Sequence, residues 1–268
     1  MVLQLLRSNL YLPLHNWLSS IGSYFYAQWQ VVKVLFTRPP RTNILSVQLY
    51  EVGVRSLPLI CATGLAIGMV LAAQSFFQLS DKGLTGITGV MVAKSMLVEI
   101  GPILSAFIIT GRVGAAMCAE LGSMKVTEQI DAMKSMGVDP IEYLLLPRYL
   151  SMACMMPILT LFSTACGILG GWIVATYLYG MSTQAFFDPL PHYIIWFDVI
   201  ANCLKSFLFG LLIVSISCFY GMETQGGASG VGRATTKSVV ISYTSILGAN
   251  FLLTIFLNAA YWYLFGFR

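Results

Sequence analysis

The sequence predicts an all-α protein that crosses a membrane several times. Of its 268 residues, 57% are hydrophobic and only 10% are charged, whereas a soluble domain carries about 25% charged residues. The charges are also unevenly spread and leave uncharged stretches at 56–80, 149–187 and 238–267. Each stretch exceeds the roughly 20 apolar residues that a helix needs to cross the hydrocarbon of a bilayer. These observations exclude an ordinary soluble fold, a disordered chain and a disulfide scaffold.

Residues 1–41 form a separate N-terminal unit. Aromatic and aliphatic residues recur at three- and four-residue spacing over 10–36 with polar residues between them, which predicts an amphipathic helix that lies in the membrane interface. The sequence Arg38-Pro-Pro-Arg41 ends this helix, because neither proline can donate a backbone hydrogen bond. Residues 42–268 form the transmembrane domain, which begins with a short linking helix over 43–55.

Five apolar segments predict five transmembrane helices. The predicted spans are 56–79, 90–115, 149–176, 197–221 and 238–265. The segments between them are a polar, glycine-rich turn at 80–90, a charged segment at 120–142, an aromatic, proline-bearing loop at 177–195 and a glycine-rich loop at 222–237. In the first span, Gly64 and Gly68 form a G-x-x-x-G pattern, which suits either close packing within the bundle or a dimer seam.

The distribution of Lys and Arg predicts the orientation of these spans. Most of these residues lie before the first span, within 112–148 and within 222–237, and few lie on the opposite side. Because cytoplasmic loops carry the excess of Lys and Arg, the N-terminal helix and both of these segments should be cytoplasmic. An odd number of spans then places the C-terminus outside.

The composition and motifs argue against catalysis by this chain alone. The six cysteines lack metal-ligand spacing and sit in apolar runs, so we interpret them as packed free thiols and expect no metal site. The net charge of +4 is too small and too scattered to indicate nucleic-acid binding. The run from Gly227 to Ala234 resembles a phosphate-binding loop only superficially, since Arg233 and Ala234 stand where a Walker A motif has Lys and Ser or Thr.

Glu99 is a carboxylate inside the second predicted span, directly before Ile100 and Gly101-Pro102. A charge at this depth is costly and usually faces a cavity, a partner or the bundle interior. The Gly-Pro step frees backbone groups beside it. Two interpretations follow: Glu99 lines a substrate cavity, or it forms a structural ion pair with Lys94 or Lys205.

The segment 120–142 is the most distinctive part of the sequence. Apolar residues at helical spacing on one side and charged residues on the other predict an amphipathic helix outside the membrane. The apolar residues are Leu121, Met124, Ile130, Met133 and Met136, and the charged residues are Glu120, Lys125, Glu128, Asp131 and Lys134. Such a helix either floats on the lipid surface or docks into the groove of a soluble partner.

Four motifs together resemble one family. They are Glu99-Ile-Gly-Pro, Gly111-Arg112-Val-Gly-Ala-Ala, Ala119-Glu120-Leu-Gly-Ser-Met-Lys-Val-Thr127-Glu128-Gln129 and Met136-Gly137-Val-Asp139-Pro140. The chain resembles the MlaE/YrbE family, the permease subunits of ABC lipid transporters that work with MCE proteins. The resemblance extends from about Gln48 into the last span and is most specific over 99–148.

The resemblance implies a homodimer of inner-membrane, multi-pass subunits with a periplasmic C-terminus. Its implied partners are an ABC ATPase subunit that binds the ATP, an MCE-domain protein, phospholipid and a small STAS-type regulatory subunit. It implies that 120–136 is a cytoplasmic coupling helix in a groove of the ATPase, with contacts from Glu120, Leu121, Met124, Lys125, Glu128, Gln129, Asp131, Met133 and Met136. It also implies an outward-open lipid cavity between the protomers, lined by Leu71, Gln74, Gln78, Leu79, Glu99 and Ile100. One departure is Val98, where family members often have a basic residue.

The sequence therefore predicts the permease subunit of an ABC transporter that moves phospholipid between the inner membrane and an MCE conduit to the outer membrane, and so maintains outer-membrane lipid asymmetry. The chain itself needs no cofactor, because a separate subunit would hydrolyse the ATP. One alternative is a gradient-driven secondary carrier that uses the intramembrane residues Glu99 and Lys205. The other is a membrane scaffold for an external lipid-binding protein.

Overall fold

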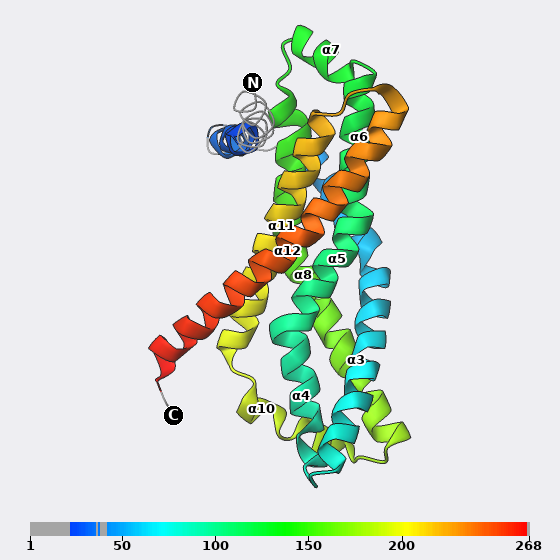
Figure 1. The fold of residues 1–268 in the computed structure, drawn as a ribbon, viewed down its shortest axis with the longest axis vertical. Helices are drawn as coiled ribbons and strands as arrows, with labels where there is room; N and C mark the ends of the chain where they lie inside the picture. The colour runs from blue at the N-terminus through cyan, green and yellow to red at the C-terminus, as the bar shows by residue number, and fades with distance from the viewer. Residues whose placement is uncertain (1–21, 36, 38–41, 267–268) are drawn as a thin grey trace, which may run out of the picture.

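The computed structural model describes residues 22–35, 37 and 42–266, and every regular element in these ranges is a helix. Residues 22–35 are helical and lie beside the upper end of the bundle in Figure 1. The rest of the predicted N-terminal unit, including 10–21, 36 and 38–41, lies outside the described residues. The predicted linking helix is present as α2 (Thr42–Val52).

Five helical segments of the described residues are long and apolar enough to cross a membrane, which confirms the predicted fold class. Each segment is one helix or several helices joined end to end, and we call it a rod. The rods are Thr42–Ser80, Thr85–Val126, Ile141–Leu178, Trp196–Met222 and Gly227–Tyr263. The first ends in α3 (Leu57–Ser80), and the second contains α4 (Thr88–Ser95), α5 (Gly101–Ile109) and α6 (Ala115–Val126). The others contain α8 (Leu146–Ile173), α11 (Trp196–Met222) and α12 (Gly227–Phe265). α12 runs obliquely across the bundle and ends apart from it (Figure 1).

Wide turns join several of these helices into continuous rods. π-helical turns at η3 (Met96–Ile100) and η4 (Thr110–Gly114) connect α4, α5 and α6. Two more, η5 (Ile141–Leu145) and η6 (Val174–Leu178), extend α8 at its two ends. The first rod is joined by the 3-10 turn η1 (Val54–Ser56), and η2 (Thr85–Ile87) leads into α4. Because π-helical turns are frequent at functional sites, η3, which contains Glu99, marks a candidate site.

The glycines of the first span serve packing within the chain. α3 lies along α8, and a Cβ atom on Gly68 would come 1.8 Å from the carbonyl oxygen of Gly167. A Cβ atom on Gly64 would come 2.5 Å from the carbonyl oxygen of Ser163. Of the two interpretations of the G-x-x-x-G pattern, the structure therefore shows close packing within the bundle for both glycines.

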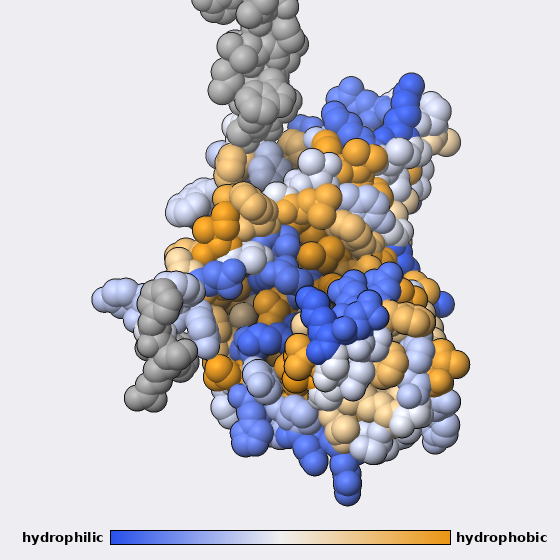
Figure 2. Space-filling view, turned by 60° about the horizontal axis from the view of Figure 1, so that its bottom comes forward, coloured by the Kyte–Doolittle hydropathy of each residue, from blue (hydrophilic) through white to orange (hydrophobic). Residues whose placement is uncertain are grey.

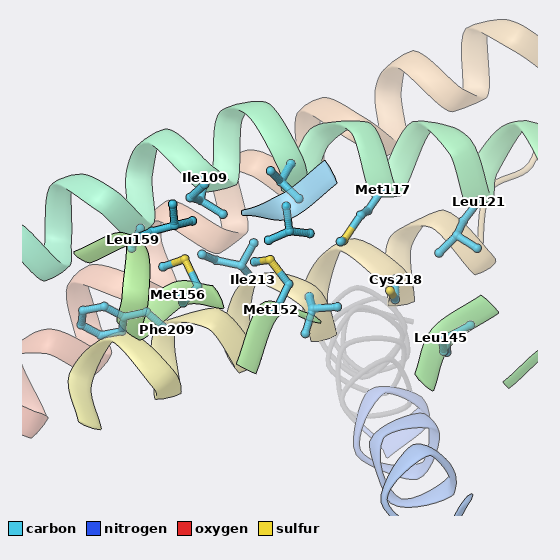
Figure 3. Close-up of a cluster of buried hydrophobic side chains, with 14 of the residues drawn as sticks. Ile109, Met117, Leu121, Leu145, Met152, Met156, Leu159, Phe209, Ile213 and Cys218 are labelled. Carbon is cyan, nitrogen blue, oxygen red and sulfur yellow. The ribbon is translucent and has the colours of Figure 1, made fainter. Parts of the chain in front are cut away.

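The main core lies where α5, α6, α8 and α11 meet (Figure 3). It is built from aliphatic and sulfur-containing side chains that are almost entirely buried, with Phe209 as a large aromatic member. Labelled members in Figure 3 include Ile109, Met117, Leu121, Met152, Met156, Leu159, Ile213 and Cys218. Val31 of the N-terminal helix belongs to the same cluster, so this helix is anchored to the bundle.

One loop prediction was wrong. The glycine-rich segment 222–237 is mostly helical, because α12 already begins at Gly227 and only a short turn separates it from α11. Gly226 and Gly227 have φ values of 87° and 69°, so the glycines make the turn and do not prevent the helix that follows. The segment 177–195 connects two spans as predicted and contains two short helices, α9 (Thr183–Phe187) and α10 (Leu190–Tyr193).

The predicted single helix over 120–136 is divided. α6 ends at Val126, and α7 (Gln129–Ser135) begins after a break at Thr127 and Glu128. The hydroxyl of Thr127 donates to the carbonyl of Ser123 at 2.9 Å, and Glu128 adopts a left-handed conformation with φ of 60°. A periodicity of apolar residues does not reveal such a break, because α6 and α7 each keep the helical spacing.

Candidate functional site

Glu99 lies at the centre of a polar cluster between three spans. Its Oε1 atom accepts hydrogen bonds from Lys205 Nζ of α11 at 2.8 Å and from Thr254 Oγ1 of α12 at 2.9 Å. Its Oε2 atom accepts from Asn250 Nδ2 at 3.1 Å. Of the two pairing partners left open by the sequence, Lys205 is therefore the one that binds Glu99.

Lys94 has a different environment. Its Nζ atom lies 3.9 Å from a carboxylate oxygen of Asp198 at the start of α11 and donates to the carbonyl of Tyr193 at 3.5 Å. Asp198 also accepts from the backbone N–H of Ile195 at 3.2 Å. Lys94 thus joins α4 to the α10–α11 connection at the far end of the bundle from α7 (Figure 1).

The backbone of the second span explains why polar side chains gather at Glu99. In the π-helical turn the N–H of Gly101 bonds the carbonyl of Met96, so the carbonyl of Leu97 loses its usual partner. Asn202 Nδ2 donates to this carbonyl at 2.6 Å. Pro102 has no N–H, which likewise frees the carbonyl of residue 98.

The second freed carbonyl is bound by the lysine of the cluster. Lys205 Nζ donates to the carbonyl of Val98 at 3.0 Å, in addition to Glu99 and Thr254. An ammonium group has three donors, and all three are used. Asn202 and Lys205, one turn apart on α11, therefore satisfy the two carbonyls that the π turn and the proline leave free.

The two charges of the pair differ in their access to the surroundings. The Lys205 side chain is 1% exposed, whereas that of Glu99 is 33% exposed. The lysine is thus a fixed internal counter-charge, and the carboxylate keeps one side available to a further group. On the face of the molecule shown in Figure 2, hydrophilic residues lie among hydrophobic ones.

Sequence reasoning missed Asn202, Asn250 and Thr254 as members of the cluster. The available signal was weak: Asn202 lies three residues before Lys205, and Asn250 and Thr254 are four residues apart in an otherwise apolar segment. Such spacings place each pair on one face of a helix. They do not indicate which helix that face contacts.

The other predicted cavity residues are spread over α3 and η3. Leu71 and Ile100 pack against the same small cluster of Ala72, Val92 and Met96. Leu79 is buried, and Gln74 and Gln78 are exposed on α3. The hydrogen bonds of Glu99 reach only α11 and α12 in the described part of the chain, so its grouping with the two glutamines stays a prediction.

The predicted coupling residues divide between the interior and the surface. Leu121 is fully buried, and Gly221 of α11 lies against its Cβ atom. Met124 and Met133 pack partly against the main core. Glu128, Gln129, Asp131 and Met136 are exposed, with 72% of Met136 accessible.

Ion pairs hold α6, α7 and α8 together. Lys125 Nζ lies 2.9 Å from Asp131 Oδ2 across the break between α6 and α7, and Lys134 lies 3.4 Å from Asp131 Oδ1. The hydrogen bond from Lys125 lowers the pKa of the Asp131 carboxyl below its ordinary value. Glu120 accepts from the buried guanidinium of Arg148 at 2.9 Å, which ties α6 to α8.

In the described residues no group of His, Cys, Asp and Glu side chains could hold a metal ion. All six cysteines are free thiols. The polar cluster around Glu99 contains a carboxylate, an ammonium, two amides and a hydroxyl. Lys205 and Asn202 are buried, so Glu99, Asn250 and Thr254 are the members of the cluster that a further polar group could reach.

Known proteins match most of the chain. The family model described as Permease MlaE matches residues 45–256. A probable ABC transporter permease protein of Rickettsia felis is 37% identical over 88% of this chain and 91% of its own length. One of Synechocystis is also 37% identical, over 89% and 90%. The intermembrane phospholipid transport system permease protein MlaE of Haemophilus influenzae is 34% identical over 79% and 81%. This chain, with its five long apolar helices, therefore belongs to the MlaE permease family.

Proposed function

We propose that this chain is the transmembrane permease subunit of an ABC transporter that moves phospholipid between the inner membrane and an MCE-protein conduit to the outer membrane. Its activity would maintain outer-membrane lipid asymmetry. Family membership supports the permease role, and the name of the Haemophilus influenzae relative supports phospholipid as the substrate. The ATPase activity would reside in a separate subunit.

The observation that carries this proposal is the Glu99–Lys205 ion pair inside the spans, in which the lysine is buried and the carboxylate is partly exposed. Lys205 neutralises Glu99 from within the bundle, while a third of the Glu99 side chain stays exposed. A lipid headgroup can therefore meet an acceptor at mid-span without the chain having to hold an unpaired charge in hydrocarbon. Two protomers would enclose the cavity, with lining from Leu71, Gln74, Gln78, Leu79, Glu99 and Ile100.

The coupling of ATP hydrolysis to lipid movement would use α7 and the end of α6. α6 belongs to the same rod as η3 and Glu99, so a displacement at α7 has a continuous helical path to the polar cluster. The Lys125–Asp131 ion pair holds α7 to α6, and Arg148 holds α6 to α8. The exposed residues Glu128, Gln129 and Met136 would contact the groove of the ATPase.

The distribution of positive charges supports the proposed orientation. The N-terminal helix and α7 would lie on the cytoplasmic side of the inner membrane, and the C-terminus on the periplasmic side. The MCE protein would then dock at the end of the bundle that carries α9 and α10, and a STAS-type subunit would bind the ATPase. ATP would be bound by the ATPase alone.

Charge reversal on α7 tests the proposal. The double variant Glu128→Lys/Asp131→Lys should release the ATPase subunit when the tagged chain is purified, because it reverses two exposed charges of the predicted coupling segment and removes the Lys125–Asp131 ion pair that holds α7 to α6. Asp81→Lys is the matched control, since Asp81 is an exposed acid at the opposite end of the rods. An unchanged ratio of ATPase to permease in the double variant would contradict the proposal.

The intramembrane pair of Glu99 and Lys205 would also suit a gradient-driven carrier. In that case, vesicles that contain only the purified chain would move lipid in response to an ion gradient. A scaffold without transport activity would tolerate Glu99→Ala while the complex still assembles. For an ABC permease, we expect that the chain alone moves no lipid in an ion gradient and that Glu99→Ala impairs function.

A further inference from the structure

A long apolar groove lies between the N-terminal helix and the bundle. Its volume is about 780 Å³, and its walls come from residues 22–35, α8, α11 and α12. Representative lining residues are Val32, Leu35, Leu150, Cys154, Leu211 and Leu252. Because α8, α11 and α12 are all span candidates, the groove would lie at the depth of the lipid acyl chains.

The N-terminal helix forms a fixed wall of this groove. The hydroxyls of Tyr24 and Ser215 on α11 are hydrogen-bonded at 2.6 Å, and Tyr149 of α8 donates to Gln28. The ring of Tyr24 also meets that of Phe219 edge to face, with centroids 5.4 Å apart. These contacts attach one wall of the groove to α8 and α11.

A second, more polar cavity continues the groove. Its volume is about 540 Å³, and it shares Tyr24, Phe25 and Leu212 with the apolar groove. It adds Tyr220, Glu223 and Lys237, which lie at the α7 end of α11 and near the start of α12. The apolar groove and the charged cavity are thus adjacent on one surface, as the apolar and polar parts of an amphiphile are adjacent in one molecule.

The two charged residues of the second cavity have opposite signs and do not pair. Lys237 Nζ lies 5.0 Å from the centre of the Tyr220 ring. Among the described contacts, neither Lys237 nor Glu223 has an ion pair or a side-chain hydrogen bond. Partial burial raises the pKa of Glu223, and the nearby Lys237 opposes this effect. An ammonium and a carboxylate that line one cavity without meeting are complementary to a ligand that carries both charges.

We propose that the groove and the polar cavity together bind one zwitterionic glycerophospholipid of the phosphatidylethanolamine type. Its acyl chains occupy the apolar groove, its phosphate binds Lys237 and its ammonium binds Glu223. The lipid comes from the leaflet on the α7 side, which is the cytoplasmic leaflet under the proposed function. This site lies on the outer surface of the bundle and does not include Glu99.

Photocrosslinking of the full chain in lipid nanodiscs tests this site. The probes are phosphatidylethanolamine and phosphatidylglycerol that carry a diazirine on one acyl chain, and mass spectrometry locates the crosslinks. The ethanolamine lipid should label the groove residues of α8, α11 and α12. Lys237→Glu should reduce this labelling about tenfold at sub-saturating lipid, which corresponds to about 1.4 kcal/mol of lost binding free energy.

A groove-filling variant gives a second test. Ala153→Trp should remove the labelling, because Ala153 lines the groove. Leu169→Trp is the control on the same helix, since Leu169 is 49% exposed and lies outside the groove. Equal labelling by the two lipids, or labelling that neither Lys237→Glu nor Ala153→Trp reduces, would overturn the proposal.

The same experiment separates this site from the proposed transport function. Glu99→Gln should leave the groove labelling unchanged, because Glu99 lies outside the groove. Loss of groove labelling in Lys237→Glu with ATP-driven transport absent from the unmodified protein would support the lipid site and contradict the transport proposal. ATP-driven transport by the unmodified protein, together with groove labelling that Lys237→Glu does not reduce, would contradict the lipid site alone.

Discussion

At the scale of single residues, the central feature is the Glu99–Lys205 ion pair, in which nearly every donor and acceptor atom has a hydrogen-bond partner. Lys205 uses its three donors on Glu99, Thr254 and the Val98 carbonyl. A buried pair of this kind adds little stability by itself, because desolvation offsets the attraction. Removal of one partner is costly, since the remaining charge is then uncompensated.

Lys205→Met should therefore destabilise the protein by about 3–5 kcal/mol. The double variant Lys205→Met/Glu99→Leu should recover most of this loss, because it removes both charges. The free energy of unfolding in detergent, measured for both variants and for Glu99→Leu alone, gives the coupling. Additive effects of the two substitutions would show that the residues do not interact.

Asn202 offers a second test at this scale. Asn202→Leu should cost about 1–3 kcal/mol, because it leaves the buried carbonyl of Leu97 without a donor. Ile200→Leu on the same helix is the control and should have little effect, since Ile200 is 63% exposed. Denaturation of the two variants in the same detergent makes the comparison. Equal stability of both would contradict the assigned hydrogen bond.

The sequence predicted Glu99 as an important residue because an intramembrane carboxylate is costly. It could not select between Lys94 and Lys205 as partners. That choice depends on which helix faces η3. Lys205 also binds a backbone carbonyl that is free because of the proline beside the π turn. Helical periodicity carries no information on either of these.

At the scale of elements, the five apolar segments were predictable, but the start of α12 and the end of α6 were not. Span positions follow from composition alone, so α3 and α11 agree closely with the expected 56–79 and 197–221. The start of α12 at Gly227 and the break at Glu128 depend on backbone conformation. Glycine signals either a turn or a close contact, and the sequence does not distinguish the two.

The α3–α8 contact should be sensitive to any side chain at Gly68. Gly68→Val should lower the free energy of unfolding by about 1–3 kcal/mol or more, because its Cβ would collide with the Gly167 backbone. Gly248→Ala in α12 is the control, with no atom within 4 Å of the added Cβ. It should be neutral or stabilise the helix by up to about 1 kcal/mol. Similar losses in both variants would contradict the packing described here.

Substitutions of Glu128 test its left-handed conformation at the break between α6 and α7. Glu128→Gly should stabilise the turn by up to about 1 kcal/mol, because glycine adopts positive φ without the steric cost of a Cβ atom. Glu128→Ala removes the same charge but keeps the Cβ, so it should give no gain. Hydrogen exchange of the α7 amides compares the two variants. Slower exchange in Glu128→Ala than in Glu128→Gly would be inconsistent with the left-handed conformation.

At the scale of the whole molecule, the chain combines a polar centre with largely apolar outer faces. α12 exposes Leu247, Phe251, Leu252, Ile255 and Phe256 over much of its length. In the proposed homodimer these side chains would face lipid or the second protomer. The rod from α4 to α6 links the polar centre to α7, which is the part of this architecture that an ATPase could move.

The most direct test of this account is lipid transfer in vesicles that contain the chain together with its co-purified ATPase subunit. Transfer of a fluorescent phospholipid should require ATP and should be lost in Glu128→Lys/Asp131→Lys, while the double variant stays folded and inserted. Transfer that proceeds at the same rate without ATP, or that an ion gradient drives in the absence of the ATPase, would contradict the account.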